Sequence, residues 1–465
     1  MAIAVVLVLL VIGSLIFHFA SPWWFTPIAS NWTTMEDTIV LTFWVTGIVF
    51  VIVNLFLAWV VWKYRHKKGQ TAAYEPESKK LEWWLTIVTS IGVAAMLAPG
   101  LVVWGKFVDV PKDAAIVEAI GQQWHWSFRF PGKDGELGHS DASLVAPDNP
   151  FGLDSEDPKG ADDVLVASPE LHLPVDQPVK LLLRSKDVLH NFTVTQFRVK
   201  MDLVPGMITH MWLTPTVPGS YEILCEELCG VGHFAMRGRV VVTKRDEFDG
   251  WLAAMPTFSQ AQALAKADTA AGAGQFAVCT ACHGQNGEGN PALNAPRLAG
   301  QADWYVARQL HHFREGLRGS HEGDTFGAQM LAFAAMLPDD TAIRNVAAYV
   351  ESLPGNEQAA TVTGNVKRGH RLYATCASCH GAEGQGIWSL NAPRLADMSD
   401  WYMVRQLLNF QHGVRGTHKA DYYGWQMGAM ADSLKDERSI NDVVAYINTL
   451  DPLPARTAMA DGRKD

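Results

Sequence analysis

The feature that most constrains the fold of this 465-residue sequence is an internal repeat in its C-terminal part. Two cysteines and a histidine recur at an offset of 97 residues, as Cys279, Cys282, His283 and then Cys376, Cys379, His380. The segment NAPRLA at 294 recurs at 391, and the two copies align without a gap over about 50 residues. We therefore predict two copies of one small α-helical domain, at residues 273–355 and 365–452.

Each copy contains the pattern Cys-x-x-Cys-His, which is the attachment signature of a c-type haem. Two thiols one helical turn apart can form thioethers to the two vinyl groups, and the adjacent histidine reaches the iron. One such pentapeptide could arise by chance or as a redox cysteine pair, but two in a preserved register make chance negligible. The sequence predicts two covalent haems, with His283 and His380 as iron ligands.

A second iron ligand has to come from the later half of each copy, where a methionine thioether would raise the reduction potential. The candidates are Met330, Met336, Met427 and Met430. The offset pairs Met330 with Met427 but pairs Met336 with a serine, so we predict Met330 and Met427. Ligation by His321 and His418 is the alternative, and it would lower both potentials; otherwise these histidines are surface residues near turns.

Two uncharged runs predict a transmembrane helical hairpin over residues 38–106. Residues 38–62 are long enough, at about 1.5 Å per residue, to cross a hydrocarbon core of roughly 30 Å. Residues 83–104 have tryptophans at both ends, as at membrane interfaces, and contain Pro99, which could kink the helix. Basic residues lie between the runs, so this loop is expected in the cytoplasm and everything after Lys106 outside it.

The N-terminal segment, residues 1–37, begins with a third apolar stretch at 3–19. It lacks the basic leader and the small-residue cleavage site of a secretory signal. We expect an uncleaved third helix, with a removed signal peptide as the alternative. The N-terminus would then be cytoplasmic, which agrees with the topology of the hairpin.

Residues 107–250 change to short β-type runs separated by Pro, Gly and Asp, which predicts an all-β sandwich or barrel. The predicted strand runs are residues 115–130, 178–185, 190–197, 210–216, 220–225 and 236–243. An insertion at 133–163 carries nine acidic residues against two lysines. It is interpreted either as a solvated loop or as a docking surface for a cationic partner. Residues 251–272, rich in Ala and Gln, are expected to form a helical or flexible linker.

Composition limits the partners and cofactors. The net charge is −10, from 38 Lys and Arg against 48 Asp and Glu, so the chain has no basic face for nucleic acid. All six cysteines lie in close pairs, which is typical of metal or haem sites rather than of a disulfide framework.

A second cluster of metal-binding residue types lies between positions 225 and 236. Two thiols, an imidazole and a thioether fall within twelve residues, as Cys225, Cys229, His233 and Met236. Soft sulfur ligands with imidazole favour copper, and zinc is the runner-up. A second imidazole is expected from elsewhere, and His190 in SKDVLHNF is the best candidate. His172 and His210 are less favoured because they lie in ordinary strand or loop patterns.

This constellation resembles the copper A site of subunit II of haem-copper cytochrome c oxidases. Residues 38–243 carry the match, as a helical hairpin followed by a cupredoxin-like domain with QQWHWSF, SKDVLHNF, VKMDLVPG and CEELCGVGHFAM. The resemblance implies a binuclear copper centre. The ligands that it implies are the bridging thiolates of Cys225 and Cys229, the imidazoles of His190 and His233, the thioether of Met236 and the carbonyl of Glu227.

The same resemblance implies roles beyond the copper ligands. The Glu227 carboxylate resembles a ligand to magnesium at the interface with subunit I. Trp124 resembles the exposed tryptophan through which electrons enter from an external cytochrome c. Glu82 resembles the proton-uptake glutamate beneath subunit I, with an ordinary flanking charge as the alternative. His125 departs from the family, which usually has tyrosine there; this leaves the copper ligands intact and concerns the local route of the electrons.

The repeat resembles the tandem dihaem cytochromes c, in which the Asn-Ala-Pro-Arg segment lines the haem edge. The resemblance implies that Pro296 and Pro393 support the proximal histidines. It also implies that Arg297 and Arg394 pair a haem propionate.

Together the resemblances imply subunit II of a bacterial caa-type oxidase, extended by two cytochrome c domains. It would be a multi-pass protein of the bacterial cytoplasmic (inner) membrane, with its copper and haem domains on the periplasmic side. Electrons would pass from cytochrome c or a quinol-cytochrome c reductase through two haems and copper A to the oxygen-reducing centre of subunit I, coupled to proton translocation. Subunits I and III would be partners, and the enzyme label belongs to the complex. The alternatives are a copper A nitric oxide reductase and a free-standing membrane-tethered carrier; copper delivery is disfavoured because a chaperone has no use for two haems.

Overall fold

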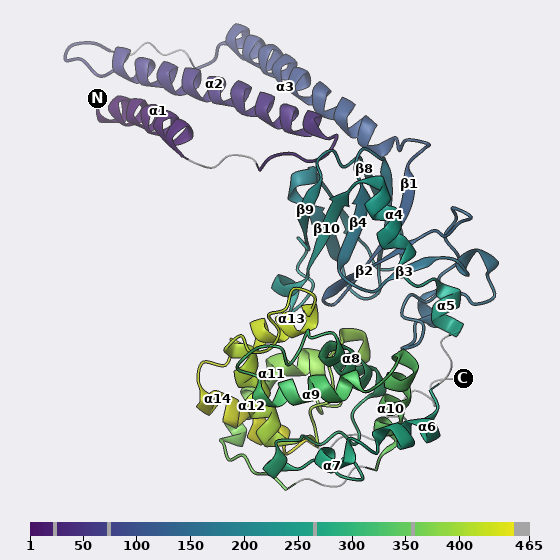
Figure 1. The fold of residues 1–465 in the computed structure, drawn as a ribbon. Coiled ribbons are helices and arrows are strands. Elements are labelled where there is room, and N and C mark those ends of the chain that lie inside the picture. Colours follow the sequence, from purple (N-terminus) through teal and green to yellow (C-terminus); the bar gives the residue numbers. More distant parts are fainter. Residues whose placement is uncertain (22–25, 72–75, 264–266, 355–358, 451–465) are drawn as a thin grey trace, which may run out of the picture.

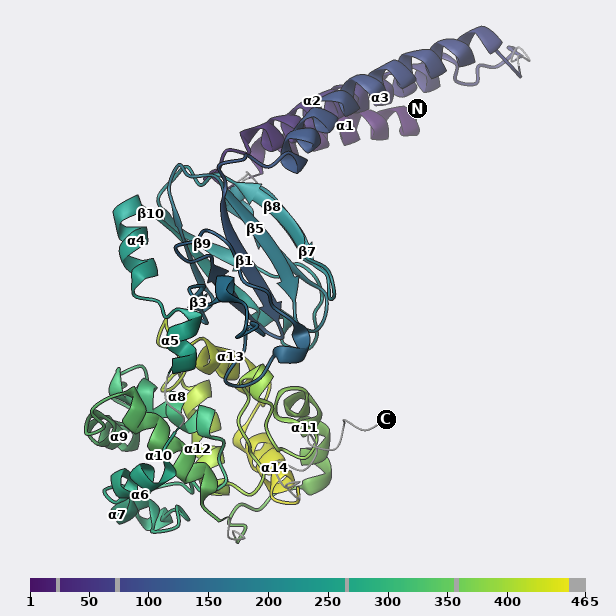
Figure 2. The same cartoon turned by 90° about the vertical axis from the view of Figure 1, so that its right-hand side faces the viewer.

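The computed structural model describes residues 1–21, 26–71, 76–263, 267–354 and 359–450. Within them the chain has three parts, namely a group of long apolar helices, a β-sandwich and a region of short helices (Figure 1). The long helices extend from one end of the sandwich, and the short helices lie at its opposite end (Figure 2). The predicted fold class, with three apolar helices, a cupredoxin-like sandwich and two helical domains, is confirmed.

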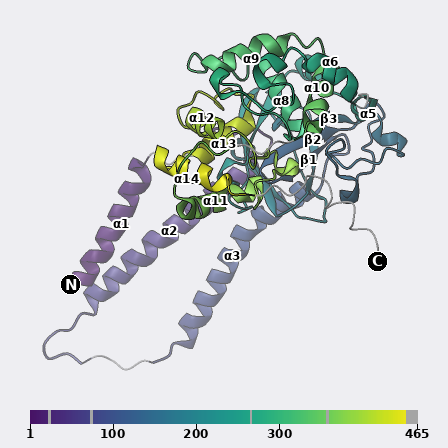
Figure 3. The same ribbon diagram turned by 90° about the horizontal axis from the view of Figure 1, so that it is seen from below.

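The three long helices project away from the rest of the molecule (Figure 3). They are α1 (Ala2–Ala20), α2 (Thr33–Lys63) and α3 (Lys79–Val108), and each is long and apolar enough to cross a membrane. Their apolar side chains are mostly exposed, which is stable only in a nonpolar surrounding. Pro99 lies inside α3, which continues past it to Val108. Retention of α1 in the mature protein stays a prediction.

An aromatic cluster fixes the base of the hairpin on the sandwich. The buried Trp32 packs edge to face against Phe107 and Trp212, with ring centroids 5.4 and 4.8 Å apart. The Trp212 indole N–H also donates to the Lys106 carbonyl at 3.2 Å. The C-terminal end of α3 therefore adjoins the sandwich, and Glu82, in the first turn of α3, lies at its far end.

Two five-stranded sheets form the sandwich, in the orders β3-β2-β1-β5-β8 and β4-β10-β9-β6-β7. Strand β5 alternates buried and partly buried residues, which is the pattern of a strand with one face on a core. The strands are β1 (Ala115–Gln122), β2 (His125–Phe130), β3 (Val164–Val166), β4 (Glu170–Pro174), β5 (Val179–Ser185), β6 (His190–Val194), β7 (Val199–Leu203), β8 (Thr209–Leu213), β9 (Gly219–Leu224) and β10 (Arg237–Thr243).

The strand pattern of the sequence is finer in the structure than expected. The run 115–130, taken as one strand, is a hairpin of β1 and β2 with Gln122 paired to His125. Strands β3, β4 and β7 were not predicted. Runs of three to five residues have few alternating positions, and the equally short β6 and β8 were predicted only because they lie within longer runs.

Acidic side chains organise the insertion at 133–163. Asp141 and Asp157 cap two short 3-10 turns, Ala142–Leu144 and Pro158–Gly160. Asp163 is buried and pairs with Arg129 at 2.8 Å, and Arg129 also pairs with Glu118 at 2.8 Å. These contacts favour the interpretation of the insertion as a structured, solvated loop.

The repeat folds into two similar helical domains. The first contains α6 (Thr269–Phe276), α7 (Thr280–His283), α8 (Asp303–Arg314), α9 (Thr325–Ala335) and α10 (Asp340–Ser352). The second contains α11 (Val366–His380), α12 (Asp400–Gln411), α13 (Tyr422–Ala431) and α14 (Glu437–Ile447). The stretch expected as a linker holds part of α4 (Arg245–Ala253), α5 (Phe258–Ala263) and the start of α6, so the first helical domain begins before residue 273.

The two helical domains contact each other through one set of interactions used twice. Arg318 donates to Gln406 at 3.1 Å and to the Tyr402 hydroxyl. At an offset of 97 residues, Arg415 donates to Gln309 at 2.9 Å and to the hydroxyl of Tyr305, the counterpart of Tyr402. The repeat therefore forms a pseudo-twofold pair, as in an isologous dimer.

Candidate copper and haem sites

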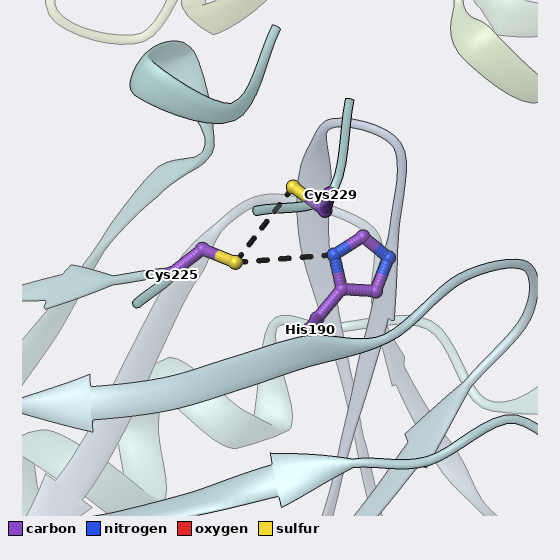
Figure 4. Close-up of side chains that lie close together, drawn as sticks. All are labelled: His190, Cys225 and Cys229. Atoms are coloured by element: carbon purple, nitrogen blue, oxygen red, sulfur yellow. Dashed lines mark hydrogen bonds between the residues drawn. The ribbon is translucent and has the colours of Figure 1, made fainter. Parts of the chain in front are cut away.

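The predicted copper ligands converge at the end of the sandwich that adjoins the helical domains. His190 is the first residue of β6, Cys225 follows β9, and the remaining ligand candidates lie in the loop before β10. The ligand atoms of His190, Cys225 and Cys229 all lie within 4.8 Å of one another, and the three residues are buried (Figure 4). The sandwich therefore brings the start of β6 and the loop after β9 together, so that their side chains form one compact set of ligand atoms.

The donor atoms form two groups, one around the Sγ atom of Cys225 and one around that of Cys229. These two Sγ atoms are 3.8 Å apart. Cys225 Sγ lies 4.0 Å from His190 Nδ1 and 3.2 Å from the Glu227 carbonyl oxygen. Cys229 Sγ lies 3.5 Å from the Nδ1 atom of His233 and 3.8 Å from the Met236 sulfur. Each thiol therefore has one imidazole and one weaker ligand beside it. This soft donor set fits a pair of copper ions.

The disfavoured histidines lie elsewhere and have structural contacts. His172 stacks on Trp251 with ring centroids 4.2 Å apart and forms a hydrogen bond with Glu170 at 2.8 Å. His210 is exposed on β8.

Asp187 orients the His190 ring, and the sequence interpretation missed it. Its carboxylate accepts a hydrogen bond from His190 Nε2 at 2.8 Å and one from the Gln123 backbone N–H at 2.7 Å. The other ring nitrogen, Nδ1, therefore faces Cys225. Such outer contacts fix the tautomer of a metal ligand. The acid three residues before the histidine in SKDVLHNF was the available signal.

The two thiols differ in their affinity for a proton. The hydrogen bond from Cys229 stabilises the Cys225 thiolate and lowers the pKa of Cys225 to about 3, whereas the same bond raises the pKa of Cys229. Burial lowers the pKa of His190, but its hydrogen bonds to Asp187 and Cys225 outweigh burial and the net shift is upward. Metal binding at this site must therefore displace protons.

Trp124 lies directly over the copper-binding loop. Its indole N–H donates to the Cys229 carbonyl at 3.1 Å. A Cβ atom on Gly232 would lie 2.5 Å from the Trp124 ring, so only glycine allows this approach.

The expectation that Trp124 is exposed is wrong, because only 6% of this residue is accessible. Helix α13 of the second helical domain covers it. Gln426 donates to the Trp124 carbonyl at 2.5 Å, and the Tyr423 ring packs edge to face on His125 with centroids 5.7 Å apart. The covering domain belongs to the same chain, and no sequence pattern indicated this contact.

Each predicted iron-binding histidine forms a hydrogen bond with the backbone carbonyl of the proline in the Asn-Ala-Pro-Arg segment of its own repeat. Nδ1 of His283 donates to the Pro296 carbonyl at 2.8 Å, and Nδ1 of His380 donates to the Pro393 carbonyl at 2.7 Å. The second nitrogen, Nε2, remains for iron. Burial lowers the pKa of both imidazoles, which favours the neutral form that ligates a metal.

The predicted haem-binding residues of both helical domains line one shared cavity. Its lining contains the motif residues and three of the candidate methionines, namely Cys279, Cys282, His283, Cys376, Cys379, His380, Met330, Met427 and Met430. The residues present thus fit two haems. The fourth candidate, Met336, is 58% exposed and does not line this cavity. His321 and His418 are exposed in turns, where each accepts a hydrogen bond from a backbone N–H. The geometry therefore favours methionine over bis-histidine ligation.

The arginine that recurs in both copies of the repeat, as Arg297 and Arg394, contacts Asp397 from each copy. Arg297 forms a two-pronged ion pair with this carboxylate, with N–O distances of 3.0 and 2.9 Å. Arg394 lies 3.5 Å from the same carboxylate. Both arginines also line the haem cavity, and their pairing with a propionate stays a prediction.

Comparison with known proteins identifies the family. Residues 115–244 match the family described as cytochrome c oxidase subunit II, periplasmic domain, and residues 269–354 and 366–451 each match the cytochrome c family. The alternative cytochrome c oxidase subunit 2 of Bradyrhizobium diazoefficiens is 56% identical over 259 residues, which are 56% of this chain and 94% of the relative. The chain belongs to the cytochrome c oxidase subunit II family. Copper A and haem c are the cofactors that these matches imply.

Other relatives resemble larger or different parts of the chain. Cytochrome c oxidase subunit 2 of Alkalihalophilus pseudofirmus is 25% identical over 332 residues, which are 68% of this chain and 86% of the relative. Among solved structures, reduced recombinant cytochrome c4 from Pseudomonas stutzeri covers 40% of this chain and all of its own, at 28% identity and a TM-score of 0.34. At that TM-score the family assignment depends on the sequence matches.

Replacing Asp187 by asparagine should weaken copper binding, because His190 loses the acceptor that fixes its ring. We expect the copper affinity to fall about 10–100-fold, measured by competition with a copper chelator. Glu170→Gln is the matched control, because Glu170 holds a histidine outside the site. Equal copper affinities for Asp187→Asn and the unmodified chain would contradict this role.

Replacing Met427 by histidine should lower the midpoint potential of one haem, since imidazole stabilises ferric iron relative to a thioether. Met330→His should lower the potential of the other haem. Redox titration of the c-type absorbance bands measures both. If Met427→His leaves both potentials unchanged and Met430→His lowers one, Met430 is the ligand.

Proposed function

We propose that this chain is the subunit through which electrons enter a proton-pumping cytochrome c oxidase, whose oxygen-reducing centre lies in subunit I. Membership of the subunit II family implies association with subunit I. The observation that carries the proposal is the position of the second cytochrome c domain, which lies on Trp124 beside the copper ligands. When bound, the haems and copper A supply one-electron carriers with sulfur and imidazole ligands.

The packing supports an order for the two cytochrome c domains. Cys379, the second thiol of the second motif, packs against the hydrophobic cluster that contains Cys225, Cys229 and Trp124. The Gln122 side chain also donates to the Ser389 carbonyl of the second domain. The second domain is therefore placed next to copper A in our proposal, and the first domain receives electrons from outside the chain.

The contacts between the helical domains support transfer from the first domain to the second. Arg308 of the first domain donates to the Asn391 carbonyl at 3.0 Å and lies over the Tyr423 ring at 4.6 Å. Tyr423 in turn contacts His125 of the sandwich. These packed side chains join the three redox domains, which supports electron transfer between them within one chain.

Two acidic residues extend the proposal to subunit I. The Glu227 carbonyl faces Cys225, and its partly buried carboxylate is proposed as a magnesium ligand at that interface. Glu82 lies at the end of α3 far from the sandwich, which is the side from which protons would be taken up. Subunit III, and cytochrome c or a quinol-cytochrome c reductase as donor, complete the proposed complex in the bacterial cytoplasmic membrane.

A reduced-minus-oxidised spectrum of the chain, purified with its partners in mild detergent, tests the proposed function. We expect haem a bands beside c bands, with oxygen consumption by the purified complex. Haem b bands without haem a, together with nitric oxide consumption, would indicate a nitric oxide reductase. Bands of haem c alone would indicate a free-standing carrier.

The contact of α13 with the sandwich has its own prediction. The double variant Tyr423→Ala and Gln426→Ala should expose Trp124, raising its oxidative footprinting several-fold, and should slow electron transfer from haem c to copper A. Phe326→Ala with Gln329→Ala is the matched control, because these residues hold the same positions in the first repeat. Equal protection of Trp124 in both double variants would contradict the proposed contact.

A further inference from the structure

The helix that covers Trp124 has a counterpart in the first domain. Helices α9 and α13 occupy equivalent places in the repeat, and each is capped by an aspartate that accepts the third backbone N–H after it. An arginine of the opposite domain lies over an equivalent ring in each case, with Arg405 over Phe326 at 4.7 Å and Arg308 over Tyr423 at 4.6 Å. The pseudo-twofold symmetry therefore extends to the surfaces of α9 and α13.

The two helices differ in what covers them. Helix α13 lies under the sandwich, whereas α9 lies on the flank of the helical region (Figure 2). Phe326 and Phe333 are 39% and 38% exposed, and Gln329 is exposed as well. With Met336 just beyond α9, these residues are spaced i, i+3, i+7 and i+10, which places them on one helical face. We call them the α9 face.

The α9 face adjoins the first haem site. Phe326, Gln329 and Phe333 also line the cavity that contains His283 and Met330. The side chains of the α9 face would therefore lie between a redox protein seated on it and the cavity that would hold the first haem. The equivalent helix of the second domain has this relation to the sandwich.

Acidic residues flank α9 along the chain. Glu322 precedes α9, Asp339 and Asp340 follow it, and Glu315 follows the neighbouring α8; all four are exposed. Only Asp340 among them is neutralised by a close arginine, in its pair with Arg314. The positive charge of Arg405 lies over Phe326 on the same face. An apolar centre with an acidic rim complements a partner that has an apolar centre and a basic rim. A second copy of this chain or an anionic lipid surface would bring like charges together.

We propose that the α9 face is the docking surface of the external electron donor, a protein whose redox group is exposed in an apolar patch surrounded by lysines. The inference rests on the proposed function and adds to it the place where the donor binds. The donor then contacts the first domain as the sandwich contacts the second. Since α13 covers Trp124, the donor does not need the copper face.

A variant that adds a positive charge tests the α9 face in the full chain, purified with its partner subunits. Met336→Lys places a positive charge on the face without removing a buried side chain. We expect the Kd for reduced mitochondrial cytochrome c, used as a basic probe at low ionic strength, to rise about tenfold, because like charges then meet. The second-order rate of haem reduction by the probe should fall by a similar factor.

The matched control is Ser433→Lys, which adds the same charge at the equivalent exposed position of the second repeat. It should leave probe binding unchanged. Leu293→Lys, at a residue 48% exposed beside the first haem motif, tests docking at the other edge of that haem. Unchanged binding by Met336→Lys would overturn the proposal. So would equal weakening by Ser433→Lys, or weakening by Leu293→Lys alone.

Two measurements separate this proposal from the proposed function. Unchanged c-type spectra in each variant show that both haem sites are intact. A small-molecule reductant bypasses protein docking, so oxygen consumption driven by it should be the same in Met336→Lys and in the unmodified complex. If the unmodified complex consumes no oxygen with that reductant, the proposed function fails, and the binding data still decide the α9 face.

Discussion

The arrangement of the redox sites depends on the packing of helix α13 against Trp124. The Gln426 side chain donates both to the Trp124 carbonyl and, at 3.3 Å, to the Ala235 carbonyl of the copper-binding loop. The indole of Trp124 in turn bonds to the Cys229 carbonyl. The Gln426 amide thus links the second helical domain to the copper-binding loop and to the β1–β2 turn that bonds to this loop. Any displacement of that domain would disturb the backbone that positions the copper ligands.

A symmetric repeat can serve an asymmetric route only if its two copies meet different neighbours. The contacts between the copies are pseudo-symmetric, with Arg318 and Arg415 in equivalent roles. The asymmetry comes from single positions. Asp397 of the second copy corresponds to Gly300 in the first, and it attracts both Arg297 and Arg394. Tyr423 corresponds to Phe326, and only Tyr423 meets the sandwich. The duplicated fold supplies the interface, and a few substitutions assign each copy its place.

Short spacings made most of the sites predictable from sequence. Cys225, Cys229, His233 and Met236 share one loop, and each haem motif is a pentapeptide, so local geometry alone brings these ligands together. His190 was predicted as the second imidazole from its place in SKDVLHNF, and it lies within the donor set. The cover over Trp124 could not be predicted, because it joins residues about 300 positions apart and depends on domain packing. Strands β3, β4 and β7 were not predicted because they are short and lie outside the longer β-type runs. Asp187 was missed because a single acidic residue can have many other roles.

The two faces of the repeat differ in charge as their proposed roles require. Burial, with Lys186 nearby, lowers the pKa of His125 to about 3, so this ring is neutral at physiological pH, and burial raises the pKa of Tyr423 to about 12, so its hydroxyl stays protonated. The contact under the sandwich is therefore buried and made by uncharged groups, as in permanent interfaces. The α9 face has exposed apolar residues within an acidic rim, as in transient complexes that are steered by charge. A fixed inner contact and an exchangeable outer one can arise from the same helix in two copies, because burial and surrounding charge, rather than fold, decide which kind of interface forms.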